Sequence, residues 1–174
     1  MKIELKNFKH FPSLSEETYC FTATLVINGI KCGTAKNGGY GGNTDVYSDR
    51  TTKGMKLIEE AENYCKSLPP YYVGKLCTID MNLENFIDDL VNTAVMEKAR
   101  LKDEKRLTKN MVKSFLYGNE REMYSLTFNV PILDAIARNP QAVVKDVKNY
   151  MKKHEGKGYR ILNTNLPQSF LSEL

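Results

Sequence analysis

The run FTATLVINGIKCGTA at 21–35 constrains the fold most, because it places Asn-Gly between two strand-like segments. Before Asn28 and Gly29, apolar residues alternate with threonine, which is typical of a strand that buries one face. Asn-Gly favours a two-residue type I′ turn, so the two segments are predicted to form an antiparallel hairpin. The predicted pairs, all on the core face, are Ile27 with Ile30, Leu25 with Cys32 and Ala23 with Thr34.

The other elements follow from apolar periodicity and turn residues, and they predict an α+β fold. A strand over 44–47 extends the hairpin to an N-terminal three-stranded antiparallel sheet, and alternation around Ile3 predicts a further strand before it. Helical spacing predicts amphipathic helices over 53–68 and from Asn82 onward. The C-terminal part is predicted to be strand–helix–strand. Its strands are predicted at 123–128 and 159–166, with a helix over 132–138 and a second helix that starts at Asn139-Pro140. A separate short strand is predicted earlier in the chain, at 72–79.

The predicted helix from Asn82 has a polar centre. No glycine or proline interrupts it before Gly118, yet 97–106 reads EKARLKDEKR. A continuous helix of about 36 residues would be about 54 Å long, more than a compact domain of this size spans. Either the polar centre, at 97–110, projects from a single domain over 1–174, or the helix breaks near Thr108. An apolar helical face is expected to resume at Met111, Val112, Phe115 and Leu116.

The net charge of +4 is unevenly distributed. Residues 97–174 carry fifteen basic and nine acidic side chains, whereas residues 51–96 carry four and seven. The C-terminal half is therefore where an anionic partner would bind, and a well-solvated surface is the alternative. No apolar run approaches the roughly 18–20 residues of a membrane-spanning helix, and MKIELKNFKH lacks the apolar centre of a secretory signal. A cytoplasmic location and no membrane partner are expected.

Few residues suggest catalysis or metal binding. The cysteines form no CxxC pair and the two histidines are far apart in sequence, so no metal site of the usual spacing is predicted. Free buried thiols are expected instead, with Cys65 on the buried stripe of a helix. No GxSxG occurs, and the neighbouring acids Asp88 and Asp89 point in different directions on a helix. We therefore expect no catalytic residue, metal or cofactor, and a protein that is not an enzyme.

The segment TAKNGGYGGNTDVYSD at 34–49 places four glycines around one tyrosine. It matches neither the P-loop GxxxxGK[ST] nor a GxGxxG that opens a helix. A glycine backbone can still approach a ligand closely, and Tyr40 can stack on a base or an aromatic ligand. The candidate ligand- or partner-binding residues are Asn37, Gly38, Gly39, Tyr40, Gly41, Gly42, Asn43 and Thr44. The alternative is a mobile connection between two strands.

The basic segment of the long helix is the candidate nucleic-acid site. Its residues are Lys98, Arg100, Lys102, Lys105, Arg106, Lys109 and Lys113. Basic side chains contact phosphates, and the nearby aromatic residues Phe115 and Tyr117 are expected to contact bases. Acidic residues interleave with the basic ones, which equally suits a solvated helix. A salt-sensitive affinity that weakens on charge reversal at Lys102 and Arg106 is predicted.

Three stretches carry a resemblance to a group of proteins. They are LKNFKHFPSLSEETYCFTATLVINGIKCGTAKNGGYGGNT at 5–44, CKSLPP at 65–70 and ILNTNLP at 161–167. The chain resembles an uncharacterised family of small proteins from Bacteroidetes, their phages and mobile elements. The family has no established activity, so the resemblance assigns no catalytic residue. It implies an accessory role, such as binding host machinery or blunting a host defence.

The expected function is a non-enzymatic binding protein of a phage or mobile element that engages a protein of its bacterial host and inhibits a host defence. Its candidate surfaces are the 37–44 loop and the polar helix. Two alternatives stay open: a nucleic-acid-binding module that uses the basic C-terminal half, and a protein that sequesters a small molecule or nucleotide with the glycine loop.

Overall fold

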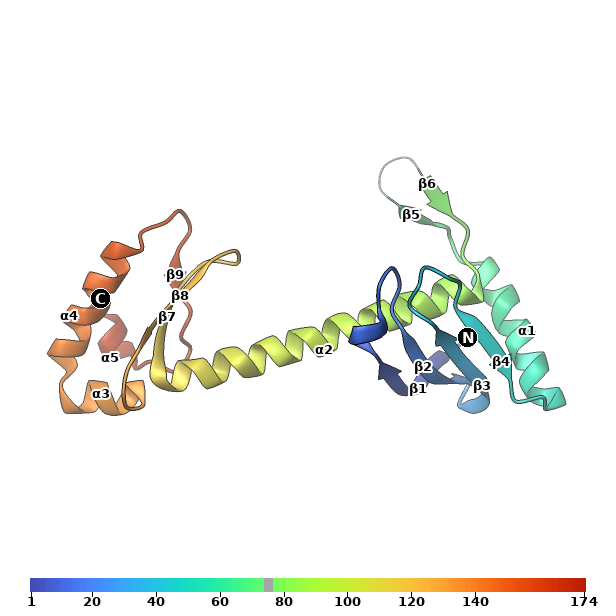
Figure 1. The fold of residues 1–174 in the computed structure, drawn as a ribbon, viewed down its shortest axis with the longest axis horizontal. Helices are drawn as coiled ribbons and strands as arrows, with labels where there is room; N and C mark the ends of the chain where they lie inside the picture. Colours follow the sequence, from blue (N-terminus) through green and yellow to red (C-terminus); the bar gives the residue numbers. More distant parts are fainter. Residues whose placement is uncertain (74–76) are drawn as a thin grey trace. The chain divides into compact units, whose positions relative to one another are not determined.

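The computed structural model describes residues 1–73 and 77–174 (Figure 1). The chain contains two compact units, Met1–Ala99 and Arg100–Leu174, and each has strands, helices and a hydrophobic core of its own. The predicted α+β fold is confirmed. A single domain over 1–174 stays a prediction, because two cores in one chain do not decide whether the units fold separately. Among the described residues, no helix is long and apolar enough to cross a membrane.

The first unit is built on an antiparallel sheet of four strands in the order β1-β2-β3-β4, one strand more than predicted. The strands are β1 (Ile3–His10), β2 (Phe21–Ile27), β3 (Ile30–Asn37) and β4 (Asp45–Ser48), with a short 3-10 helix η1 (Pro12–Leu14) between β1 and β2. A second, two-stranded sheet pairs β5 (Tyr71–Val73) with β6 (Cys77–Ile79). Residues 72–73 and 77–79 are strand as predicted, but they belong to two paired strands and not to one, and 74–76 lie outside the described residues.

Two helices complete the core of the first unit. α1 (Thr52–Lys66) starts where the Thr51 hydroxyl accepts a hydrogen bond from the Gly54 N–H at 2.9 Å, as an N-cap should. Apolar side chains of α1 and of the first part of α2 (Leu83–Lys113) pack with the sheet in one cluster. The thiols of Cys20, Cys32 and Cys65 are free and buried, as predicted. The side chain of Cys77 lies outside the described part of the chain.

The β2–β3 hairpin has the predicted turn but a different register. Asn28 and Gly29 both have positive φ, as a type I′ turn requires, and Ile27 pairs with Ile30. The pairs predicted for Leu25 with Cys32 and Ala23 with Thr34 were wrong. A β-bulge shifts the register, and the observed pairs are Leu25 with Gly33, Thr24 with Thr34 and Ala23 with Ala35. The extra residue keeps Cys32 in the core and also turns Ala35 and Asn37 inward.

Helix α2 is one uninterrupted helix of 31 residues, so it does not break near Thr108. Its polar centre is exposed at nearly every position from 96 to 110. The helix ends at Lys113, and the apolar helical face predicted through Leu116 is wrong. Phe115 and Leu116 instead belong to strand β7 (Ser114–Gly118), where pairing with β8 (Met123–Thr127) overrides the helical pattern. Projection of 97–110 into solvent stays a prediction.

Besides the last part of α2, the second unit contains a three-stranded sheet in the order β8-β7-β9 and three helices. The elements after β8 are α3 (Ile132–Arg138), α4 (Pro140–Lys153), β9 (Arg160–Ile161) and α5 (Gln168–Leu171). The predicted start of α4 is confirmed, since the Asn139 side chain accepts a hydrogen bond from the Ala142 N–H at 3.1 Å. Helix α5 was not predicted.

The predicted last strand over 159–166 shrinks to two residues. Beyond β9 the buried Asn163 side chain takes the place of a pairing strand. Its Oδ1 accepts a hydrogen bond from the Leu116 N–H at 2.6 Å, and its Nδ2 donates to the Ser114 carbonyl at 3.0 Å. One amide side chain therefore satisfies the backbone of β7 that a longer β9 would have satisfied.

Candidate functional site

Asn37, the last residue of β3, holds the glycine loop from inside. Its side chain is buried, and both ends of its amide are used. Oδ1 accepts hydrogen bonds from Thr18 Oγ1 at 2.9 Å and from the Gly39 N–H at 2.8 Å. Nδ2 donates to the Gly42 carbonyl at 2.9 Å and to Thr44 Oγ1 at 3.1 Å. This side chain therefore ties both ends of the loop to the segment before β2.

Gly39 packs closely against the segment 14–20. Its carbonyl accepts hydrogen bonds from the N–H groups of Glu16, Glu17 and Thr18 at 2.9, 3.0 and 3.3 Å. A Cβ at Gly39 would lie 2.1 Å from the Leu14 carbonyl oxygen, and its φ of +91° is in the region that favours glycine. The close backbone approach expected of these glycines is thus made to the chain itself.

The loop is poorly suited to hold a phosphate. The Gly39 N–H donates to Asn37, and the Gly41 N–H donates to Thr18 Oγ1 at 3.3 Å. A phosphate-binding nest needs such N–H groups free. The carboxylate of Glu17 also lies next to Gly41, since a Cβ there would be 2.2 Å from Glu17 Oε2. The arrangement therefore disfavours the nucleotide-binding alternative.

The eight predicted loop residues divide into a buried and an exposed set. Asn37, Gly39 and Thr44 are buried and hold the loop in place. The exposed residues are Gly38, Tyr40, Gly41, Gly42 and Asn43. The Tyr40 side chain is 64% exposed, which makes it the large apolar group that this loop offers to a partner.

Thr44 connects the loop to helix α2. Its N–H donates to Glu84 Oε1 at 3.1 Å, and its hydroxyl donates to Asp88 Oδ1 at 2.5 Å. Both acids are in the first two turns of α2, one turn apart on the same face. The end of the glycine loop is therefore docked on the helix by two charge-assisted hydrogen bonds.

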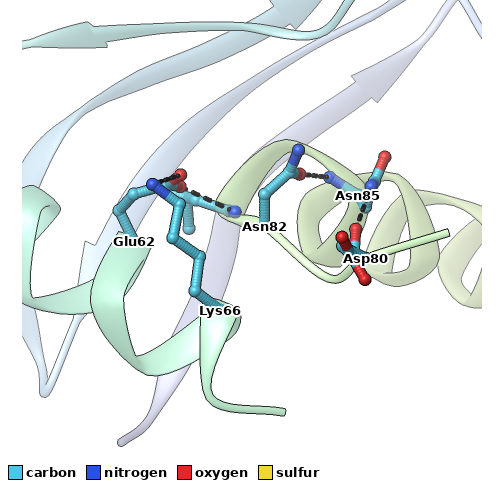
Figure 2. Close-up of polar contacts among 6 residues, drawn as sticks. Glu62, Lys66, Asp80, Asn82 and Asn85 are labelled. Atoms are coloured by element: carbon cyan, nitrogen blue, oxygen red, sulfur yellow. Dashed lines mark hydrogen bonds and ion pairs between the residues drawn. The ribbon is translucent and has the colours of Figure 1, made fainter. Parts of the chain in front are cut away.

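The start of α2 is itself fixed by the polar contacts in Figure 2. Asn82 Oδ1 accepts a hydrogen bond from the Asn85 N–H at 2.7 Å, the usual N-cap geometry. Glu62 of α1 accepts from the Leu83 N–H at 2.8 Å and forms an ion pair with Lys66 at 3.0 Å. These contacts join α2 to α1 and so set the direction in which the first acids of α2 point.

A pocket of about 500 Å³ lies beside the loop, between the segment 15–19 and α2. Its apolar walls are the rings of Tyr19 and Phe21 and the side chain of Val91. Four carboxylates also line it: Glu16, Glu17, Asp88 and Asp89. We call these seven residues the acidic pocket. A volume of this size is within the range of ligand-binding pockets, roughly 300–1,000 Å³.

The acidic pocket perturbs one of its own carboxyl groups. Partial burial raises the pKa of Asp88, and the nearby Glu84 and Asp89 carboxylates raise it further, whereas the hydrogen bond from Thr44 lowers it. A positive group that entered the pocket would relieve this unfavourable electrostatic environment. The chemistry of the pocket therefore favours a cationic, partly apolar ligand.

The convergence of these acids was not predicted. Asp88 and Asp89 were interpreted as neighbours that point apart, but both line the pocket, where Glu16 and Glu17 join them. The helical spacing of Glu84 and Asp88 was visible in the sequence. Their partner Thr44, at the end of the glycine loop, could not be predicted, since Thr44 and Asp88 are 44 residues apart. Within residues 1–73 and 77–174, no group of three or more metal-binding side chains is placed to hold a metal ion.

The predicted nucleic-acid residues all lie on α2 and are exposed. Arg100 and Arg106 form ion pairs within the helix, with Glu104 at 3.4 Å and Asp103 at 3.2 Å. Phe115 is fully buried and Tyr117 nearly so, in the core of the second unit. The expectation that these two aromatic side chains contact bases was therefore wrong.

Comparisons with protein-family models, with curated proteins and with solved structures found no match.

Proposed function

We propose that this chain is a non-enzymatic binding protein that engages a protein of its bacterial host, as an accessory protein encoded by a phage or mobile element. The proposal combines the resemblance of residues 5–44 with the surface formed by Tyr40 and the acidic pocket. In this account the partner acts in host machinery or host defence, and the complex forms in the host cytoplasm.

The observation that carries the proposal is the acidic pocket next to a loop whose shape is already set. A loop that is held by Asn37, Gly39 and Thr44 loses little conformational freedom on binding, so its contacts contribute more to affinity. Tyr40 offers an exposed aromatic anchor, the type of side chain that often dominates protein interfaces.

The charge of the pocket identifies the part of the partner that it binds. Four carboxylates around apolar walls match a lysine or arginine side chain, whose apolar stem packs against rings while its charged head meets carboxylates. An anionic partner would be repelled at the same place. We therefore expect a basic segment of the host protein to enter the acidic pocket.

Affinity capture with matched variants tests the proposal. The tagged chain is incubated with nuclease-treated lysate of a Bacteroidetes host, in parallel with Glu16→Lys/Asp89→Lys in the pocket. The control is Glu59→Lys/Glu60→Lys, the same charge change on exposed positions of α1. We expect a stoichiometric host protein that the wild type and the control capture and the pocket variant loses. Equal capture by all three proteins would show that the pocket is not the binding site.

A further inference from the structure

Four lysines form one face of the part of α2 that belongs to the second unit. Lys102, Lys105, Lys109 and Lys113 are spaced by three, four and four residues, which places them along one side of a helix with 3.6 residues per turn. All four side chains are exposed. We call these residues the lysine face. It extends over about 16 Å of helix axis at 1.5 Å per residue.

The charge of the lysine face is not compensated by the acids of the same helix. Asp103 and Glu104 form ion pairs with Arg106 and Arg100, which take up the negative charge of this segment. In the described part of the chain, none of the four lysines has an ion pair. The acids therefore balance the arginines and leave a continuous positive strip.

The second unit adds to this local charge. Residues 100–174 carry fourteen basic and eight acidic side chains. The potential over the lysine face is consequently positive from both near and distant charges. A repeating anion gains more from such a strip than a single anion does, because each of its charges can meet a different lysine.

This part of α2 has few apolar residues, which favours a polyanion as its partner over another helix or a lipid surface. Leu101 and Val112 are exposed beside the lysines but lie eleven residues apart, with Lys105 and Thr108 between them. A helix–helix seam needs an apolar residue every three or four positions, and insertion into a lipid surface needs a broad apolar face. The other apolar residues of 101–113, Leu107 and Met111, are half-buried, and residues 102–106 are all charged, so neither arrangement is present.

We propose that the lysine face of α2 binds the phosphate backbone of nucleic acid without sequence preference. One strand of B-form DNA carries one phosphate per 3.4 Å of axis, so a strip of about 16 Å faces about five phosphates. The buried positions of Phe115 and Tyr117 are consistent with binding by charge alone, with no stacking on bases.

Fluorescence anisotropy with a labelled 20-base-pair duplex of arbitrary sequence tests the proposal on the full chain. Four phosphate contacts predict a slope of about −3.6 in a plot of log affinity against log salt, which is a loss of about 150-fold between 50 and 200 mM. Lys105→Gln/Lys109→Gln should halve the slope to about −1.8 and reduce that loss to about 12-fold. Glutamine keeps the helix propensity, so circular dichroism should show an unchanged helix content.

The matched control is Lys148→Gln/Lys152→Gln, two exposed lysines four residues apart on α4 of the same unit. This control should leave the slope near −3.6. An equal effect of both double variants would overturn the proposal, because net charge and not the lysine face would then explain binding. Binding to vesicles that contain phosphatidylserine, with no binding to the duplex, would also overturn it.

Discussion

The glycine loop depends on the buried side chain of Asn37. Asn37→Ala removes four hydrogen bonds and leaves the Gly39 N–H and Thr44 Oγ1 at buried positions without this partner. With a net contribution of about 1 kcal/mol for each bond, and more where a buried partner stays unsatisfied, the free energy of unfolding of the first unit should fall by about 3–4 kcal/mol. That is a large share of the total stability of a typical domain.

The matched control is Asn43→Ala, an exposed asparagine of the same loop, for which we expect a change within about 0.5 kcal/mol. Urea unfolding is followed through the NMR methyl signals of Leu25, which is fully buried in the core of the first unit, so the second unit does not contribute. Hydrogen exchange of the Glu16 amide, which donates to the Gly39 carbonyl, reports whether the loop opens. If Asn37→Ala costs no more than Asn43→Ala, the loop is not held as described.

Further predictions concern single groups in either unit. Because folding raises the pKa of Asp88 above its ordinary 3.8, the contribution of Asp88 to stability should fall as the pH rises from that ordinary value through the raised one, and Asp88→Asn should remove this contribution in urea unfolding above pH 3.8; an unchanged pH dependence would contradict it. Burial raises the pKa of Cys65 to about 11, so the native thiol should resist iodoacetamide at pH 8 and react after urea unfolding; rapid native labelling would contradict its burial. Gly39→Ala should lower the thermal midpoint, because the added Cβ would clash with the Leu14 carbonyl and alanine disfavours the positive φ of this position; an unchanged midpoint would refute that packing. Asn163→Ala should cost about 2 kcal/mol in the second unit and expose the Leu116 amide to hydrogen exchange; retained protection would show that β7 has another partner there.

Local sequence signals predicted the elements that depend on neighbouring residues. Asn28-Gly29 specified the hairpin turn, and Asn139-Pro140 specified the start of α4, because each signal acts through the backbone within a few residues. The apolar stripe of α1 also located Cys65 in the core.

The errors occurred where distant residues decide the structure. The alternation of apolar residues in β2 and β3 does not indicate the bulge that shifts their register. The apolar spacing at the start of β7 fits a helix, but its residues form a strand because they pair with β8. Asn163 ends β9 through a side-chain contact 47 residues away in sequence. These outcomes depend on tertiary contacts that periodicity does not encode.

The candidate site shows the same division. The sequence identified Tyr40 in the glycine loop as a candidate binding residue, and its side chain is exposed in the structure; its role in binding stays a prediction. The acidic pocket could not be predicted from the sequence, because its walls come from the segment 15–19, β2 and α2, which are distant in sequence and meet only in the folded chain. The close approach of Gly39 was predicted in kind, but its target is the segment before β2 and not a ligand.

The most direct test of the proposed function is site-specific photocrosslinking in host cells, with Tyr40 replaced by p-benzoylphenylalanine. The control places the same group at Leu133, an exposed position on α3 of the second unit. We predict one discrete crosslinked host protein at Tyr40, absent at Leu133 and lost when Glu16→Lys/Asp89→Lys is added. No crosslinked protein at Tyr40, or the same products at both positions, would contradict a partner-binding surface at the glycine loop and the acidic pocket.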